Sequence, residues 1–403
     1  MRHLIPDPSS VVASTTPQRP DRPPMLDSAD PSSFAWTVIH QRHPALIEQV
    51  LAAHPYGPAQ VAALRRLAGE ELVRPLDAAT FDAAAWQVWG AGQFGRRWDE
   101  VPFLWAESYF YRRLLDAVGF FEPGPLFWLD PFSDRKAAEL ADPGLVTELA
   151  ALDDLPDLPA QARAEAALTA SLWGNRADLG FALHAAAGTE RVAELVVDHS
   201  VAFWELVGRA ARIAIVADNA GRELLADLVL VDELLTSGRA AQVVIHVKPT
   251  PYFVSDATAA DVSDCLRRMA AADGNAARIA GRLVAAFRSG QVGLRAHWFW
   301  VAPLELAQMP SDLAAQFTPP TVTILKGDLN YRRLVGDRPW PPTTAPAVAA
   351  DGFRARWAAL RTLKSEVVVG VGDDALRRLD EQPGWRTSGS YAMVQVSALT
   401  PAG

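Results

Sequence analysis

The second half of the chain alternates short apolar runs with helical stretches, and this alternation limits the fold more than any other feature of the sequence. The runs are rich in β-branched and aromatic residues, which are typical of strands. They are residues 212–218 (RIAIVAD), 241–248 (AQVVIHVK), 292–301 (VGLRAHWFWV), 321–327 (TVTILKG), 365–371 (SEVVVGV) and 391–397 (YAMVQVS). Between them lie helical patterns such as Glu223–Leu235, Val262–Ala272 and Ala277–Arg288. Strands that alternate with helices predict an α/β domain whose mostly parallel sheet is covered on both faces.

The first half of the chain has a different character. Residues 1–32 are rich in Pro, Ser, Asp and Thr, a composition that predicts a disordered tail. From Phe34 on, apolar residues recur at helical spacing and β-branched runs are few, so residues 33–207 are predicted to be helical. The predicted helices include Val61–Leu72, Leu104–Val118, Ala162–Trp173 and Ala187–Leu206. The expected organisation is therefore a tail at 1–32, a helical region at 33–207 and an α/β domain at 208–403.

Composition narrows the class of function. The chain has 403 residues, of which 50% are hydrophobic, and this is ample for a large core. A net charge of −9 argues against a nucleic-acid-binding protein, because no strongly basic face is available. The single cysteine, Cys265, excludes disulfides within the chain and thiolate zinc sites. No stretch has the pattern of a signal peptide or of a membrane span, so we expect a cytoplasmic protein without a membrane partner. The oligomeric state stays open.

Polar side chains follow two of the predicted strands. Asp218 and Asn219 come at the end of the first strand, and Asp256 ends a later segment, FVSD, that is predicted to be extended. The carboxyl ends of parallel strands open onto the crevice in which such sheets bind ligands. Two carboxylates and one amide are oxygen ligands that suit Mg²⁺ or Mn²⁺ and do not suit zinc. The alternative is that Asp218 or Asn219 only caps the next helix, with Glu223 adding negative charge to its first turn.

A second polar group follows the strand at 321–325. Lys326 would emerge at the same edge of the sheet as Asp218. The residues after it are predicted to begin a helix and are Gly327, Asp328, Leu329, Asn330, Tyr331 and Arg332. A lysine beside helix N-terminal amides suits a phosphate or a carboxylate. The alternative is a glycine turn in which Asp328 caps the helix and pairs with Arg332 on the surface.

The third candidate is the basic motif RTLK, which contains Arg361 and Lys364 and precedes the predicted strand 365–371. If that strand runs antiparallel to the others, its beginning lies at the same edge of the sheet as Asp218. Lys364 would then reach the site. The alternative is a solvated basic pair on the surface.

Four stretches, taken together and in this order, resemble the damage-control phosphatase family, which is also known for an acidic-residue methyltransferase-like, metal-binding domain. They are DNAGRELLADL (218–228), HVKPTPYFVSDAT (246–258), LKGDLNYRRLVGDRPW (325–340) and RTLKSEVVVGV (361–371). The Arg361-Thr362-x-Lys364 motif resembles the branch of the family that acts on sugar phosphates. The similarity extends over almost the whole chain, from about Phe34 to Val396.

This resemblance implies a helical N-terminal region packed on a Rossmann-like α/β/α domain. It implies metal ligation by Asp218, Asn219 and Asp256, and it places Lys326 near the phosphate among the catalytic residues. The residues implied to contact the substrate are Glu223, Asp328, Leu329, Asn330, Tyr331, Arg332, Arg361 and Lys364.

The function implied by the resemblance is the metal-dependent hydrolysis of sugar phosphates, such as fructose 1-phosphate or fructose 6-phosphate, in metabolite damage control. Mn²⁺ or Mg²⁺ is the expected cofactor, with Co²⁺ and Ni²⁺ as further candidates, and a small-molecule sugar phosphate is the expected partner. A cation would neutralise phosphate oxygens, and Lys326, Arg332 and Lys364 would stabilise the charge that builds during transfer. No Asp-x-Asp pair ends the first strand, which argues against an aspartyl-phosphate intermediate.

Two other functions stay open. One, which the resemblance also implies, is an S-adenosylmethionine-dependent protein-glutamate O-methyltransferase, for which Glu223 and Asp256 would contact the cofactor. The absence of a glycine-rich loop after the first strand disfavours it. The other is a sugar-phosphate-binding protein without catalytic activity.

Overall fold

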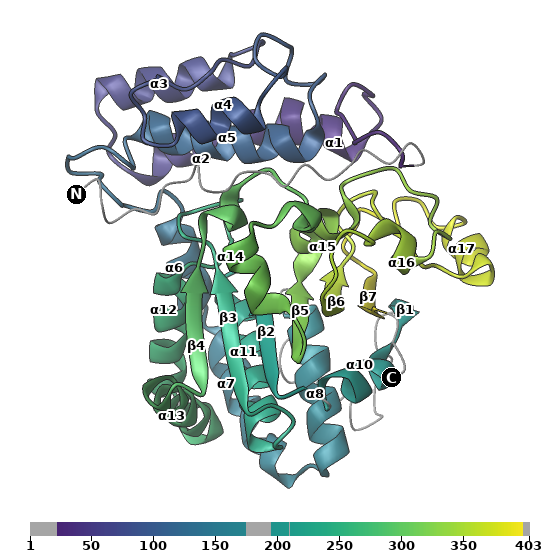
Figure 1. Ribbon diagram of the computed structural model, residues 1–403. Coiled ribbons are helices and arrows are strands. Elements are labelled where there is room, and N and C mark those ends of the chain that lie inside the picture. The colour runs from purple at the N-terminus through teal and green to yellow at the C-terminus, as the bar shows by residue number, and fades with distance from the viewer. Residues whose placement is uncertain (1–21, 175–194, 209, 398–403) are drawn as a thin grey trace.

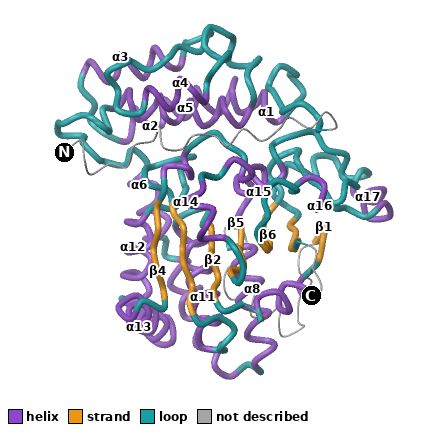
Figure 2. The backbone as a smooth tube through the Cα atoms, in the orientation of Figure 1, coloured by secondary structure: helices purple, strands orange, loops and turns teal. Residues whose placement is uncertain are grey.

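The computed structural model describes residues 22–174, 195–208 and 210–397. Its strands form one central sheet in the order β1-β7-β6-β5-β2-β3-β4 (Figure 1) and are drawn in orange in Figure 2. They are β1 (Leu195–Asp198), β2 (Arg212–Val216), β3 (Gln242–Val247), β4 (Val292–Ala296), β5 (Thr321–Lys326), β6 (Arg356–Thr362) and β7 (Ala392–Val396). Strands β6 and β7 are antiparallel, and the other neighbouring pairs in this sheet are parallel. The predicted mostly parallel α/β fold is confirmed.

The central strands are buried on both faces of the sheet. All six residues of β5 and five of the six residues of β3 are buried. Because both faces are covered, these strands are near-continuous runs of β-branched residues and do not alternate between apolar and polar side chains. For this reason five of the six predicted runs contain a strand.

The prediction of a strand at residues 365–371 is wrong. These residues form no strand, although most of them are buried. Side chains take the place of a neighbouring strand, since Arg361 donates to the carbonyl oxygen of Val367 and Gln395 donates to that of Val369. The strand in this part of the chain is β6. Its sequence, RWAALRT, combines alanines with polar ends and lacks the β-branched run on which the prediction relied.

Strand β1 also departs from the prediction of one helix over Ala187–Leu206. Residues 187–194 lie outside the described residues, and the remainder forms β1 and α10 (Ser200–Val207). β1 pairs with β7 and so extends the sheet. The division of the chain at residue 207 stays a prediction, and elements on both sides of it contribute to the sheet and its cover.

Each face of the sheet has its own apolar core. The helices over one face are α7 (Gly144–Ala151), α8 (Ala160–Trp173), α10, α11 (Gly221–Thr236), α12 (Ala259–Ala270) and α13 (Gly274–Ser289). Shorter elements cover the other face. They are η4 (Trp298–Val301), η5 (Leu306–Gln308), α14 (Ser311–Ala314), η6 (Ala315–Phe317), α15 (Gly327–Val335), α16 (Pro346–Ala349) and α17 (Asp373–Leu379).

The first helices form a layer across one end of the sheet (Figure 1). They are α1 (Phe34–Thr37), the π-helix η2 (Val38–Arg42), α2 (His43–Ala53), α3 (Pro58–Ala68), α4 (Ala83–Trp89) and α5 (Phe103–Val118). Their core is aromatic, with Trp86, Trp105 and Tyr109 in mutual contact. From this layer α6 (Ser133–Ala141) and η3 (Leu152–Asp157) lead to the helices beside the sheet. Across the described residues, every helix is too short or too polar to span a lipid bilayer.

The disordered tail predicted for residues 1–32 falls mainly on residues 1–21, which lie outside the described residues. Residues 22–32 make specific contacts instead. Arg22 forms ion pairs with Glu305 at 2.9 Å and with Asp351 at 3.0 Å, and the amide of Leu26 donates to the carbonyl oxygen of Asp337. The composition of this segment does not indicate these contacts, because their partners lie in distant parts of the chain.

The order of the strands changes direction at β2. The chain continues from β2 to β3 and β4 on one side, whereas β5 and β6 lie on the other. Open α/β sheets bind ligands in the crevice beyond the carboxyl ends of the strands at such a switch point. Here the side chain of Asp218, after β2, packs against the backbone of Gly327, after β5, since a Cβ atom added to Gly327 would lie 1.9 Å from Oδ2 of Asp218. Gly327 also has a φ of +80°, which glycine adopts without strain.

Replacing Gly327 by alanine should therefore destabilise the protein. A left-handed conformation and a methyl group forced into packed surroundings together predict a loss of about 2–5 kcal/mol in the free energy of unfolding. Urea denaturation measures this loss. Gly281→Ala is the matched control, because Gly281 is exposed in α13 and a Cβ atom there meets nothing within 4 Å. The free energy of unfolding of that variant should rise by about 0.5–1 kcal/mol. Equal stability of the two variants would refute the close approach of Gly327 to Asp218.

Candidate functional site

A cleft of about 1260 Å³, part of it open to solvent, lies where the helical layer faces the carboxyl edge of the sheet. One wall comes from α1 to α2, α5 and α6, and the other from residues that follow β2, β3, β5 and β6. The predicted site residues that line it are Asp218, Asn219, Asp256, Asp328, Leu329, Arg332 and Lys364. The predicted site residues that do not line the cleft are Glu223, Lys326, Asn330, Tyr331 and Arg361.

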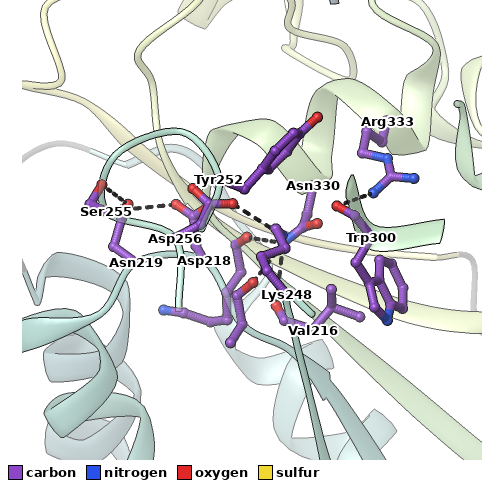
Figure 3. A network of polar contacts seen from close by, with 12 residues as sticks. Val216, Asp218, Asn219, Lys248, Tyr252, Ser255, Asp256, Trp300, Asn330 and Arg333 are labelled. Atoms are coloured by element: carbon purple, nitrogen blue, oxygen red, sulfur yellow. Dashed lines mark hydrogen bonds and ion pairs between the residues drawn. The ribbon is translucent and has the colours of Figure 1, made fainter. Parts of the chain in front are cut away.

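The structure brings together the three predicted metal ligands (Figure 3). Asn219 and Asp256 form an isolated antiparallel bridge, and the amide of Ala257 donates to the carbonyl oxygen of Asp218 at 2.8 Å. Ser255 Oγ donates to Asn219 Oδ1 at 2.5 Å, and Asn219 Nδ2 donates to Asp218 Oδ2 at 3.0 Å. Backbone and side-chain hydrogen bonds thus hold two carboxylates and one amide at the switch point.

The segment that carries Asp256 is a turn, and the prediction of an extended segment there is wrong. Phe253 and Val254 have positive φ values of 46° and 64°. Such values are uncommon for non-glycine residues and cost of order 1–3 kcal/mol each, which the surrounding contacts must offset. Phe253 stacks on Tyr111 of α5, with ring centroids 4.9 Å apart. The helical layer therefore supports the turn that presents Asp256.

Burial makes this group of acids electrostatically unfavourable. The pKa of Asp218 is raised well above its usual value, first by burial and then by the negative charges of Glu223 and Asp256. Burial also raises the pKa of Asp256, and the ammonium of Lys248, 3.2 Å from Asp256 Oδ2, partly opposes that shift. A bound cation would relieve the remaining repulsion. The donor set of two carboxylates and an amide oxygen therefore fits a hard divalent cation.

The described residues contain no group of three or more His, Cys, Asp or Glu side chains placed to hold a metal ion. Any metal here would depend on Asn219 as the third ligand. Its Oδ1 already accepts from Ser255, so a cation would share that oxygen. Carbonyl and amide oxygens are ordinary ligands for Mg²⁺-type cations, which also retain several waters.

Neither of the two capping alternatives describes these residues. Helix α11 has Ala220 at its N-cap, and the amide of Arg222 donates to Glu139 of α6. Helix α15 has Lys326 at its N-cap, without a side-chain cap. Asp328 forms an ion pair with Arg361 at 2.8 Å and makes no surface pair with Arg332.

The structure does not bring Lys326 into the cleft, contrary to the prediction. Its ammonium lies 3.0 Å from Asp227 Oδ1 of α11 and donates to Ser171 Oγ of α8 at 2.9 Å. These partners are buried and so is the lysine. The partners of the ammonium thus come from α8 and α11. Nothing in the order of residues around Lys326 indicates them.

Lys364 lies at the predicted edge for a different reason from the one expected. It follows β6, which is parallel to β5, so the carboxyl ends of the two strands meet at one edge. Its amide donates to Asp328 Oδ1 at 3.1 Å, and its side chain lines the cleft. Among the described residues, no carboxylate lies within ion-pairing distance of its ammonium.

The predicted contact residues on α15 divide between the cleft and the interior. Asn330 donates to the carbonyl oxygen of Ala217 at 3.2 Å and so ties α15 to the end of β2. Tyr331 is fully buried and donates to Gln395. Arg332 reaches the cleft, where it pairs with Glu107 at 2.6 Å. Leu329 contributes apolar lining.

Two charged residues of the site were not among the predicted site residues. Lys248 follows β3, and the strand-end rule that selected Asp218 applies to it equally. Glu107 lines the cleft from α5. Its partner is Arg332, 225 residues away, and not the arginines next to it on the helix. No local signal identifies Glu107.

Comparisons with known proteins identify the relatives of this chain. Residues 38–377 match the family model described as the damage-control phosphatase ARMT1-like domain. The damage-control phosphatase ARMT1 of Danio rerio is 30% identical, over 93% of this chain and 97% of that protein. The protein of the same name from Rattus norvegicus is 28% identical, over 93% and 98%. In fold, the chain is similar to the crystal structure of a DUF89 family protein from Pyrococcus horikoshii, with a TM-score of 0.50, 16% identity, and coverage of 86% of this chain and 93% of that one.

The charge state of Glu107 yields a test of the cleft. Burial raises its pKa to about 7, although Arg332 opposes the shift. Between about pH 4.5 and 7 the folded state then binds more protons than the unfolded state, so stability falls as the pH rises through this window. Glu107→Gln removes this dependence. Between pH 4.5 and 7 the wild type should therefore lose about 3 kcal/mol more of its free energy of unfolding than the variant does. Urea denaturation of both proteins across this pH range measures the difference. A constant difference across the window would contradict the burial of this carboxyl.

Proposed function

The chain belongs to the damage-control phosphatase family with an ARMT1-like domain, and from this premise we propose that it is a metal-dependent phosphatase that hydrolyses sugar phosphates of the fructose 1-phosphate or fructose 6-phosphate type. The observation that carries the proposal is the convergence of Asp218, Asn219 and Asp256 with Lys364 in one cleft at the switch point of the sheet. In the reaction, water displaces the sugar oxygen from phosphorus, and the products are the sugar and inorganic phosphate.

Asp218, Asn219 and Asp256 would hold the cation, of which Mn²⁺ and Mg²⁺ are the first candidates. When bound, such a cation neutralises negative charge on phosphate oxygens. The buried carboxylates prepare the site for it, because their repulsion is relieved only when positive charge is present. Lys248 neutralises part of that charge and holds Asp256 in place.

Lys364 is the residue best placed to bind a phosphate oxygen. It is half-buried in the lining, and the hydrogen bond from its backbone amide to Asp328 fixes its position at the end of β6. Arg361 in turn forms an ion pair with Asp328 and so helps to fix its carboxylate. The charge of Arg332 is largely taken up by Glu107 and Asp337, so Arg332 mainly orders the cleft wall. Lys326 has its own buried partners, and we assign it no contact with phosphate.

The sugar would lie where the helical layer meets the turn after β3. Tyr111 and Phe253 stack nearly parallel there, with an interplanar angle of 24°, and both line the cleft. Aromatic faces suit the C–H face of a sugar ring, and polar groups along the edge can bind its hydroxyls.

Substitution of Asp256 tests the proposed site. Asp256→Asn keeps the size of the side chain and removes one ligand charge, so phosphate release should fall by about 1000-fold, equivalent to about 4 kcal/mol of transition-state stabilisation. The control is Asp264→Asn, because Asp264 is a surface carboxylate on α12 whose side chain is 45% exposed. Circular dichroism checks that both variants are folded. Full activity of the Asp256 variant would remove this site from the mechanism.

A phosphate-release screen tests the function itself. The protein, stripped of metal with a chelator, is assayed on sugar phosphates after addition of Mg²⁺, Mn²⁺, Co²⁺ or Ni²⁺. We expect turnover that requires the added cation. Turnover that persists in the chelator would refute the metal dependence. Transfer of a labelled methyl group from S-adenosylmethionine in place of phosphate release would favour the methyltransferase, and a sugar phosphate that raises the melting temperature without being consumed would favour a binding protein.

A further inference from the structure

The cleft wall opposite the sheet contains a feature that hydrolysis of a simple phosphate ester does not use. Helices α1, η2 and α2 follow one another without a break over residues 34–53. The residues of this run that line the cleft include Phe34, Val38, Arg42, Leu46 and Gln49, which recur at helical spacing. One face of the N-terminal helical run therefore lies along the cleft, and Arg42 is the charged residue on this apolar face.

The π-helical turn helps to place Arg42. η2 covers Val38–Arg42, and the chain continues directly into α2 at His43. A single π turn inserted into an α-helix shifts the register of the residues around it and is frequent at functional sites. Here the turn ends at Arg42, whose guanidinium lies 4.8 Å from the ring centroid of Phe34. The arginine thus remains in contact with the wall of the cleft while it is exposed.

A second arginine, Arg135 of α6, lines the same cleft from the helical side. Among the described residues, no carboxylate lies within ion-pairing distance of Arg42 or Arg135. Two arginines of the neighbouring α5 are paired, Arg112 with Asp82 and Arg113 with Glu70. Arg42 and Arg135, in contrast, present two guanidinium groups, unpaired within the described part of the chain, to the same cleft.

The charges in the cleft separate into two regions. Asp218, Asp256 and Lys364 belong to the sheet edge, whereas Arg42 and Arg135 belong to the opposite, helical wall. The carboxylate on the helical wall, Glu107, is paired with Arg332. The phosphate that is cleaved must lie at the sheet edge, because the carboxylate and amide ligands are there. The arginines of the other wall are then available to a different part of the bound molecule.

We propose that Arg42 and Arg135 form a second anion subsite, which binds a second phosphate or carboxylate group of the substrate. This inference rests on the proposed function for the position of the first phosphate, and it specifies the substrate class as phosphorylated sugars that carry another anionic group. Guanidinium groups bind phosphate and carboxylate oxygens through paired N–H donors, which suits this task better than a lysine would.

The test compares two ligands that differ only in the second phosphate. Binding of fructose 1,6-bisphosphate and of fructose 1-phosphate to the full-length protein is measured by calorimetry in a chelator, so that neither ligand is hydrolysed by metal-dependent turnover. The wild type should bind the bisphosphate about tenfold more tightly. Arg42→Gln and Arg135→Gln should each reduce this preference several-fold, and the double variant should abolish it. Arg66→Gln on α3, an exposed arginine outside the cleft, should leave both dissociation constants unchanged.

Several results would overturn the subsite. These are a wild type that does not prefer the bisphosphate, a preference that survives the double substitution, and an equal weakening of both ligands, which would show that the arginines only attract anions in general. Because binding is measured without turnover, the result is independent of the phosphate-release screen. If no phosphate is released from any sugar phosphate but the preference depends on both arginines, the proposed function fails while the second subsite stands.

Discussion

The helical layer is joined to the sheet by buried charges around Arg332, and the shape of the cleft depends on them. Arg332 donates to Glu107 of α5 and to Asp337, each at 2.6 Å, and its guanidinium lies 4.5 Å from the ring centroid of Phe103. Asp337 also accepts the amide of Leu104 at the start of α5, at 3.1 Å. Removing one member of such a buried group leaves an uncompensated charge and costs about 3–5 kcal/mol. The two walls of the cleft are therefore held at a defined separation by a few fully buried groups.

The parts of the fold and site that depend on local order could be predicted from the sequence. β2, β3 and β5 are apolar runs because both faces of the sheet are covered, and Asp218 was found by its position at the end of such a run. Properties set by distant packing could not be predicted in this way. Lys326 also ends a strand, but Ser171 and Asp227 bind its ammonium away from the cleft.

The same limit explains the strand that was misassigned. Residues 365–371 have the composition of a strand, and their backbone oxygens are bonded by Arg361 and Gln395 instead of by a ladder. Glu107 could not be assigned a role because its partner is far away in the chain. For residues 365–371 the composition identified burial correctly, and in both cases the polar partner that decides the outcome is distant in the chain.

The two walls of the cleft come from separate stretches of the chain. Residues 34–135 provide the helical wall, and residues 218–364 provide Asp218, Asn219, Asp256 and Lys364. Sequence change on the helical side can therefore alter which molecules fit, while the proposed metal ligands are left intact. This division makes residues 34–135 the natural place to look for, or to engineer, a change of specificity.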